Sequence, residues 1–349
     1  MTSKRRTIVI GAILAVVLGG GVLAWQAWQQ DSRLATAVAL APGDSQRLSW
    51  TDWSGVREEL GADLTGAGPE EVEAFLDRGY DADLTSTSAV LTSATALQEQ
   101  WDLSPADLEW ELLAQAVDGQ VVLLGPGEDF DYEAFRERLR AAGYVEPDEE
   151  GGTWQAGEGE LAELGLPPEV GSVRVDEDAG VVATSEVAAY LAQWDEELRE
   201  DDVDEGVADV VGAYDEVRAL SAVVYTGDQA CGELAMSQAD GADNARADQL
   251  IADAGEIHPL RGYGMAALPG DAVRVAMAFE SDDQARTDAD TRSTLAAGDA
   301  PGQGGTFPDR FRLGEVSARG NVVRMELAPT EGSYVLSDLS SGPVLFATC

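Results

Sequence analysis

The chain opens with an uninterrupted apolar segment. Residues 8–25 carry no charged side chain, and Trp25 and Trp28 stand at the end of the segment, where indole rings favour a membrane interface. A helix needs about 20 residues to cross the roughly 30 Å hydrocarbon layer, whereas a signal-peptide core usually has about 7 to 15. The pattern therefore predicts a transmembrane signal-anchor at residues 7–28.

The flanking charges predict the orientation of this anchor. Basic residues occupy positions 4–6 in a short tail, residues 1–6, and the next one is Arg33. Because positive charge is retained inside, we expect a single-pass protein of the cell membrane with a cytoplasmic N-terminus and an extracytoplasmic C-terminal region. The alternative is a signal peptide cleaved near Ala24 or Ala27, or within residues 35–37, and it also implies export.

Residues 29–46 are predicted to be a stalk or linker, with folding beginning near Arg47. Helices are predicted downstream wherever apolar residues recur at a spacing of three or four positions, in several cases behind a capping residue. These patterns are Ser104 before Leu108, Leu112 and Ala116; Asp131 before Phe135, Leu139 and Ala142, ending at Gly143; Val187, Leu191, Trp194 and Leu198; Val207, Val210, Val211, Tyr214 and Val217; and Ser281 with Gln284.

Short apolar segments separated by turn residues predict strands. They cover residues 121–124, 173–175, 181–183, 220–225, 264–268, 273–279, 311–317 and 322–327. Hairpins dominate the later strands. The predicted fold class is therefore α+β, with an N-terminal transmembrane helix followed by mostly antiparallel sheets and packed helices.

The extracytoplasmic part can be divided into two similar subdomains, residues 47–200 and residues 206–349. Residues 121–183 and 273–327 each follow the order strand, capped helix and hairpin. The acidic segment 195–205 is the expected boundary between the subdomains.

Composition favours a folded, strongly acidic exterior. Hydrophobic residues make up 44% of the 349 positions, enough for a core. All 65 acidic residues follow the anchor, against 19 of the 22 basic residues. Such a surface repels phosphate, so nucleic acid is excluded as a partner. Lysine occurs only at Lys4, which excludes Schiff-base chemistry outside the membrane.

The two cysteines, Cys231 and Cys349, both belong to the exported part. An even pair in an oxidising compartment predicts one disulfide, and two free thiols are the alternative. A bridge would close a loop of over 100 residues, for which the chain-entropy model gives a stabilisation of about 4 to 5 kcal/mol.

No catalytic motif is present, and neither a cofactor nor a metal ion is predicted. Histidine occurs once, at His258, and no nucleophile elbow, HExxH or P-loop occurs. The segment 125–127 lacks the third glycine of a phosphate-binding turn. The acidic segment 195–205 does not match an EF-hand, because Val203 and Gly212 stand where ligands are required. We interpret it as a solvated hinge, with a weak cation site as the alternative.

The most distinctive segment of the exported part is at residues 48–54. Trp50, Asp52 and Trp53 are candidates for a ligand-binding surface, because paired indoles can stack on a sugar or a peptide. The alternative is that both indoles belong to the core.

Residues 48–57 and 342–349 resemble the corresponding segments of uncharacterised membrane-anchored proteins of high-GC Gram-positive bacteria. The resemblance implies an N-terminal anchor and an extracytoplasmic α+β region, and it implies no activity.

Together these features predict a membrane-anchored extracytoplasmic protein that is not an enzyme and binds a protein or another envelope component. The alternative is an extracytoplasmic hydrolase of cell-wall glycan that uses paired carboxylates. A purely structural role as a stalk is a third interpretation.

Overall fold

The computed structural model describes residues 32–149, 151–194 and 203–349. None of the helices in these ranges combines the length and the apolar character that a membrane span requires. The predicted anchor at residues 7–28 lies outside the described residues.

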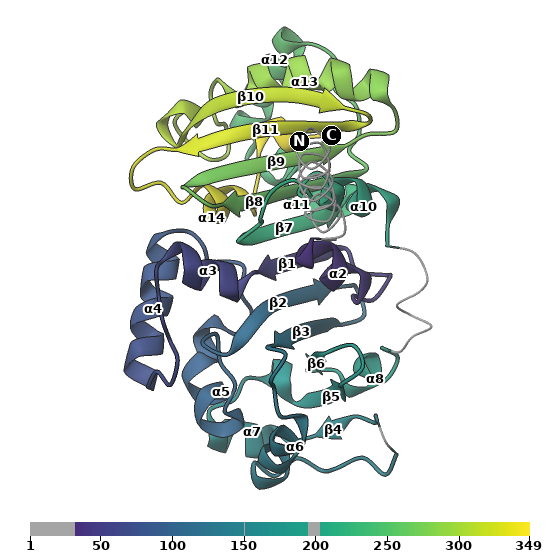
Figure 1. The fold of residues 1–349 in the computed structure, drawn as a ribbon. Helices are drawn as coiled ribbons and strands as arrows, with labels where there is room; N and C mark the ends of the chain where they lie inside the picture. Colours follow the sequence, from purple (N-terminus) through teal and green to yellow (C-terminus); the bar gives the residue numbers. More distant parts are fainter. Residues whose placement is uncertain (1–31, 150, 195–202) are drawn as a thin grey trace, which may run out of the picture.

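One sheet of eleven strands runs through the described part of the chain, and every pair of neighbouring strands is antiparallel (Figure 1). The spatial order is β10-β11-β9-β8-β7-β1-β2-β3-β6-β5-β4. The predicted α+β class with antiparallel pairing is therefore confirmed. The strands are β1 Arg47–Thr51, β2 Leu108–Gln115, β3 Gln120–Pro126, β4 Trp154–Gln155, β5 Ser172–Asp176, β6 Val181–Ser185, β7 Ser221–Thr226, β8 Gly262–Leu268, β9 Ala272–Ala278, β10 Phe311–Arg319 and β11 Val322–Pro329.

The two halves of this sheet have the same strand order. From the centre outwards it is β1-β2-β3-β6-β5 in the first half and β7-β8-β9-β11-β10 in the second. The first strands begin at residues 47 and 221, and the helices that follow them begin at residues 53 and 227, a shift of 174 residues in both cases. Because β1 pairs with β7, the halves share one hydrogen-bonded sheet instead of forming two separate sheets.

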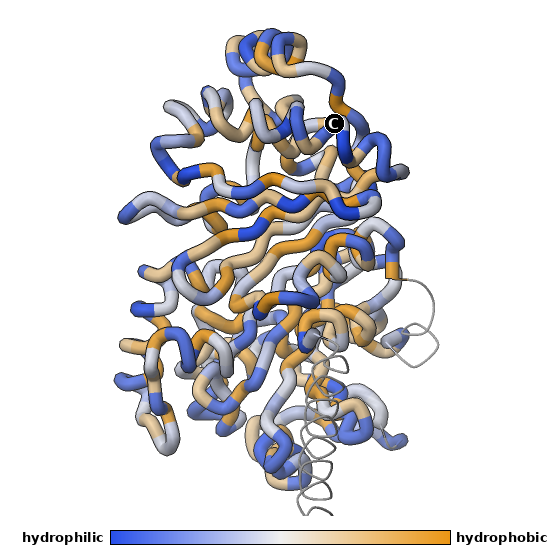
Figure 2. Tube along the Cα trace, turned by 45° about the horizontal axis from the view of Figure 1, so that its top comes forward, coloured by the Kyte–Doolittle hydropathy of each residue, from blue (hydrophilic) through white to orange (hydrophobic). Residues whose placement is uncertain are grey.

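Helices cover both faces of the sheet. The first face carries α3 Trp53–Glu59, α4 Pro69–Asp81, α5 Ala94–Trp101, α6 Tyr132–Ala141 and α7 Glu158–Leu164 in the first half, and α11 Gly227–Glu233, α12 Gly241–Ala254, α13 Asp282–Ala296 and α14 Val335–Leu339 in the second. The second face carries α2 Arg33–Ala39, α8 Ala188–Leu191 and α10 Glu205–Gly212. Apolar positions are concentrated along the central strands, and hydrophilic positions on the outer helices (Figure 2).

Capping residues determine where several helices begin, as the sequence predicts. Asp131 accepts a hydrogen bond from the backbone nitrogen of Ala134 at the start of α6, and Gly143 has a positive φ of 88° just beyond its end. Ser281 accepts from the backbone nitrogen of Gln284 at the start of α13. Asp204, from the acidic segment, caps α10 in the same way, while residues 195–202 lie outside the described residues.

The helix predicted after Ser104 is wrong. Residues Leu108–Gln115 form β2, and Ser104 belongs to a turn in which Asp107 accepts from its backbone nitrogen and hydroxyl at 3.1 and 3.0 Å. Leu108 packs on the first face and Leu112 on the second, because the register of β2 shifts between Leu108 and Trp110, so their spacing of four residues does not reflect a common helix face. Pairing with β1 and β3 decides between the two structures.

The predicted stalk is also wrong over its described part. The helix α2 buries Leu34, Ala37 and Val38 against the second face, so the folded region begins before Arg47. A peptidase acting within residues 35–37 would cut a packed helix. Two predicted helices are shorter than expected: α8 ends at Leu191, and α10 ends before Tyr214. Leu198 lies outside the described residues.

Candidate functional site

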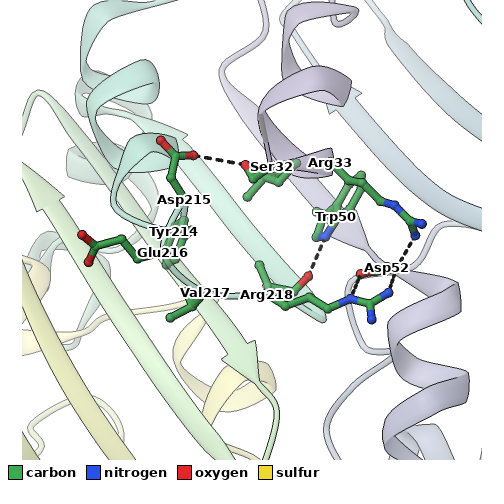
Figure 3. Close-up of a pocket in the computed structure, with 11 residues that line it drawn as sticks. Ser32, Arg33, Trp50, Asp52, Tyr214, Asp215, Glu216, Val217 and Arg218 are labelled. Atoms are coloured by element: carbon green, nitrogen blue, oxygen red, sulfur yellow. Dashed lines mark hydrogen bonds and ion pairs between the residues drawn. The ribbon is translucent and has the colours of Figure 1, made fainter. Parts of the chain in front are cut away.

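A cavity of about 490 Å³ lies where the two halves of the sheet meet, on the face that carries α2 and α10. It is lined by the start of α2, the end of β1 and the loop between α10 and β7 (Figure 3). We call it the seam cavity. Its lining residues are Ser32, Arg33, Leu34, Trp50, Asp52, Tyr214, Asp215, Glu216, Val217, Arg218 and Ala219.

Asp52 occupies the centre of a charged network in this cavity. It follows β1 and caps α3 by accepting from the backbone nitrogen of Gly55 at 2.9 Å, which fixes its carboxylate. Arg218 contacts both carboxylate oxygens, with Nε to Oδ2 at 2.5 Å and Nη2 to Oδ1 at 3.2 Å. Arg33 approaches Oδ1 at 3.5 Å. The Asp52 side chain is only 3% exposed, so two guanidinium groups neutralise a nearly buried charge.

The two arginines have further partners that hold them in place. Arg218 donates to Ser54 at 2.9 Å and pairs with Glu58 at 2.6 Å. Its hydrogen bonds with Asp52 raise the pKa of Arg218 above its ordinary value. Arg33 also pairs with Glu109 at 3.0 Å. Ion pairs and hydrogen bonds therefore hold both guanidinium groups in position.

The opposite wall is acidic. The Asp215 carboxylate accepts from the Ser32 hydroxyl at 3.2 Å (Figure 3). Glu216 pairs with Arg319 at 3.1 Å and with Arg324 at 3.4 Å, two residues of the β10–β11 hairpin. Negative charge on this wall thus faces the arginines across the cavity.

Apolar side chains form the floor between the two charged walls. The indole nitrogen of Trp50 donates to the Ala219 carbonyl at 2.9 Å, and the ring stacks on Trp110 with centroids 5.7 Å apart. Tyr214 is fully buried, and burial raises the pKa of its hydroxyl above the ordinary range. The floor is therefore uncharged and rigid.

The pairing of these groups determines what the cavity can do. Each of the five charged side chains that line it has an ion pair or a hydrogen bond, as described above. A rigid apolar floor between fixed charges of both signs is suited to recognising the shape and charge of a ligand.

The structure separates the three ligand-surface candidates. Trp50 and Asp52 line the seam cavity, although they are only 1% and 2% exposed. Trp53 begins α3 on the other face of the sheet, is fully buried, and donates to Glu111 at 3.1 Å. The two indoles therefore do not form a common stacking surface.

Sequence reasoning missed Arg33, Arg218 and the loop 214–219. Asp52 and Arg218 are 166 residues apart, and only the pairing of β1 with β7 brings them together. Arg218 stands two residues before a predicted strand, and this position in the sequence does not indicate that it pairs with Asp52.

The predicted disulfide is present. Cys231 and Cys349 are bonded, with Cα atoms 5.7 Å apart, and the bridge joins α11 to the last residue of the chain. His258 lies elsewhere and contacts Asp288 through Nδ1 at 2.6 Å. Within the described ranges, no group of three or more histidine, cysteine or acidic side chains is arranged to hold a metal ion.

Comparisons with known proteins assign no family. No family model matches the chain, and no curated protein matches it. One similar solved structure is titled "Structure of crystal form I of TP0453". It has 6% sequence identity and a TM-score of 0.41, over 87% of this chain and 96% of the other. Similarity at this level identifies neither a fold family nor a function.

Proposed function

We propose that the chain is a membrane-anchored extracytoplasmic binding protein that recognises another component of the cell envelope through the seam cavity. The observation that carries the proposal is the pairing of every charged side chain in that cavity. Such a site offers charges in fixed positions beside an apolar floor, which suits recognition of the shape and charge of a ligand.

The predicted anchor would place this cavity close to the membrane. Ser32 lines the cavity, and four residue steps separate it from the end of the anchor at residue 28. At about 3.5 Å per step, these span at most about 14 Å. A membrane protein or a component near the membrane surface is therefore the expected partner.

The hydrolase of cell-wall glycan is the alternative. Within the described part of the chain, Asp83 and Glu111 are the carboxyl groups whose pKa is raised, in both cases by burial. Glu111 is 1% exposed and accepts four hydrogen bonds, and Asp83 accepts from the backbone nitrogens of Leu336 and Ser337 at the start of α14. Both groups are committed to structural contacts, which favours binding over catalysis.

A direct test places a photoreactive amino acid at Val217, in the seam cavity of the full-length protein in its native membrane. The matched control places it at Val117, which is 81% exposed in the β2–β3 turn. We expect a discrete crosslinked species from Val217 alone, identified by mass spectrometry. No adduct from Val217, or the same adducts from both positions, would contradict the proposal.

The alternative has its own test. The assay measures turnover of purified cell-wall material by the full-length wild type and by Asp83→Asn. Turnover by the wild type that is lost in the variant, at an unchanged circular dichroism spectrum, would favour the hydrolase. We expect no turnover from either protein.

A further inference from the structure

A second cavity, of about 380 Å³, lies where other elements of the two halves meet. It is formed by the ends of α3 and α4, the turn between β8 and β9, and the loop between β11 and α14. We call it the acidic cavity. Its lining residues are Glu59, Leu60, Asp81, Ala82, Asp83, Leu84, Ala267, Leu268, Asp271, Ala272, Val273, Pro329, Thr330, Glu331, Gly332 and Ser333. None of them lines the seam cavity.

The interior of the acidic cavity is aliphatic. Leu84, Leu268 and Val273 are between 3% and 7% exposed and are fixed by the surrounding core. Leu60 and Pro329 complete the apolar surface. Such an interior favours an apolar segment of a ligand and disfavours a hydrated metal ion.

The charged side chains that line the cavity are all acidic, and the Arg78 guanidinium lies at its edge, where it donates to the Leu60 carbonyl at 3.2 Å. Among its lining residues are five carboxyl groups and no arginine, lysine or histidine. Glu59 accepts from the backbone nitrogen of Gly270, and Asp83 caps α14, so these two have structural roles. The exposed carboxylates of Asp81, Asp271 and Glu331 have neither an ion pair nor a hydrogen bond within the described ranges. This differs from the seam cavity, where each charge has a partner.

An aromatic pair adjoins the acidic cavity. Tyr80 precedes Asp81, Tyr334 follows Ser333, and the two ring centroids are 5.9 Å apart. Tyr80 is 55% exposed, although tyrosine rings are usually at least partly buried. Exposed aromatic rings beside carboxylates attract cations through their π faces.

We propose that the acidic cavity binds a lysine or arginine side chain of a partner polypeptide. The aliphatic stem would pack on Leu84 and Leu268, and the cationic head would lie among the three unpaired carboxylates. The volume suits one long side chain with its neighbours, since it is near the lower end for ligand pockets, about 300 to 1,000 Å³. An apolar interior with unpaired carboxylates at its rim is complementary to such an amphipathic cation.

Titration of the purified full-length protein in detergent tests the proposal. The probe is the capped tripeptide Leu-Lys-Leu, and the matched probe is Leu-Gln-Leu. We expect the glutamine peptide to bind at least tenfold more weakly at low salt. Binding of the lysine peptide should weaken as salt is raised, because exposed charges are screened.

Matched variants separate a specific site from general acidity. The cavity variant is Asp81→Asn, Asp271→Asn and Glu331→Gln, and the control variant is Glu73→Gln, Asp178→Asn and Asp253→Asn, at exposed positions outside the cavity. Both variants remove three negative charges. We expect the cavity variant to lose about tenfold in affinity, as three weak ion pairs imply, and the control variant to lose less than twofold.

Three results would overturn the proposal. The first is equal affinity for the lysine and glutamine peptides, and the second is an equal loss of affinity in the two variants. The third is spermidine binding as tightly as the lysine peptide, which would indicate a small polyamine ligand instead. Because the carboxylates that are changed have no contacts within the described ranges, both variants should keep the melting temperature of the wild type. The Val217 crosslink tests the seam cavity independently.

Discussion

The two halves of the sheet share a strand order but stabilise their buried charges differently. The first half buries Glu111 on β2 without an ion pair, and the second buries the ion pair of Arg292 and Asp288 on α13. Each charged group fixes a segment that has little regular secondary structure. The comparison shows how one topology is stabilised by different side chains in its two copies.

Glu111 is stabilised by donors alone. Its carboxylate accepts from the Trp53 indole at 3.1 Å, the Ser88 hydroxyl at 2.8 Å, and the backbone nitrogens of Ala89 and Val90 at 2.5 and 3.3 Å. Burial raises the pKa of Glu111, and the four donors oppose this rise. The contacts attach the segment 88–90 to the sheet.

Arg292 is stabilised by an ion pair and by carbonyl groups. It contacts Asp288 at 2.7 Å, the carbonyls of Phe346 and Thr348 at 2.8 Å, and the His258 carbonyl at 2.7 Å. Both side chains of the ion pair are fully buried. Burial lowers the pKa of Arg292, and Asp288 opposes this change. With the disulfide, these contacts hold the C-terminal segment of the second half.

The largest expected effect on stability comes from removing the disulfide. The double variant Cys231→Ser, Cys349→Ser should lose about 4 kcal/mol of unfolding free energy, because the bridge spans a sequence separation of 118 residues and restricts the unfolded chain. Urea unfolding measures the loss. Chemical reduction of the disulfide in the wild type should cause the same loss of unfolding free energy. A loss below about 1 kcal/mol would show that Arg292 alone holds the C-terminal segment.

Breaking the buried ion pair should have the next largest effect. Arg292→Met removes the arginine partner of the buried Asp288 carboxylate, which should cost about 3 kcal/mol, the lower end of the range for such changes, because His258 still contacts Asp288. Arg246→Met is the control, because Arg246 and Asp299 form an exposed pair worth about 0 to 1 kcal/mol. Equal losses of unfolding free energy in the two variants would show that burial of the ion pair does not increase its contribution to stability.

Glu111→Gln should cost less, about 2 kcal/mol at neutral pH, because the amide nitrogen of glutamine cannot accept from the donors that it would face. Since the folded pKa of Glu111 is raised, its protonation favours the native state. This contribution to the unfolding free energy is complete below 4.5, the ordinary pKa of a glutamate, and is lost as the pH rises through the pKa of Glu111 in the folded protein. The unfolding free energy of the wild type should therefore exceed that of the variant by less and less as the pH rises from 4. A difference that widens would show that the donors lower the pKa instead.

Local features of the fold were predictable from the sequence. The caps at Asp131 and Ser281 depend on neighbouring residues, and the β10–β11 hairpin depends on its own turn. The cysteine pair was predictable because no other cysteine could compete with it. β2 was misassigned because its apolar spacing resembles that of a helix, whereas the strand contains a register shift and is defined by its pairing with β1 and β3.

Features that depend on distant residues were not predictable. The pairing of β1 with β7 joins residues 170 to 178 positions apart, so neither the continuous sheet nor the seam cavity has a local signal. Asp52 was a candidate because of its neighbouring indoles, whereas its arginine partner at position 218 was not. The donors to Glu111 come from residues 53 and 88–90, which only the folded chain brings together.

The proposed role of the seam cavity is tested most directly by filling it. In crosslinked native membranes, the amount of partner recovered with the full-length protein should fall at least tenfold in Val217→Trp, because the larger ring would occupy the cavity between its charged walls. Val117→Trp, at the exposed turn, should recover as much partner as the wild type. Equal recovery with Val217→Trp and the wild type, at unchanged melting temperature, would contradict binding through the seam cavity.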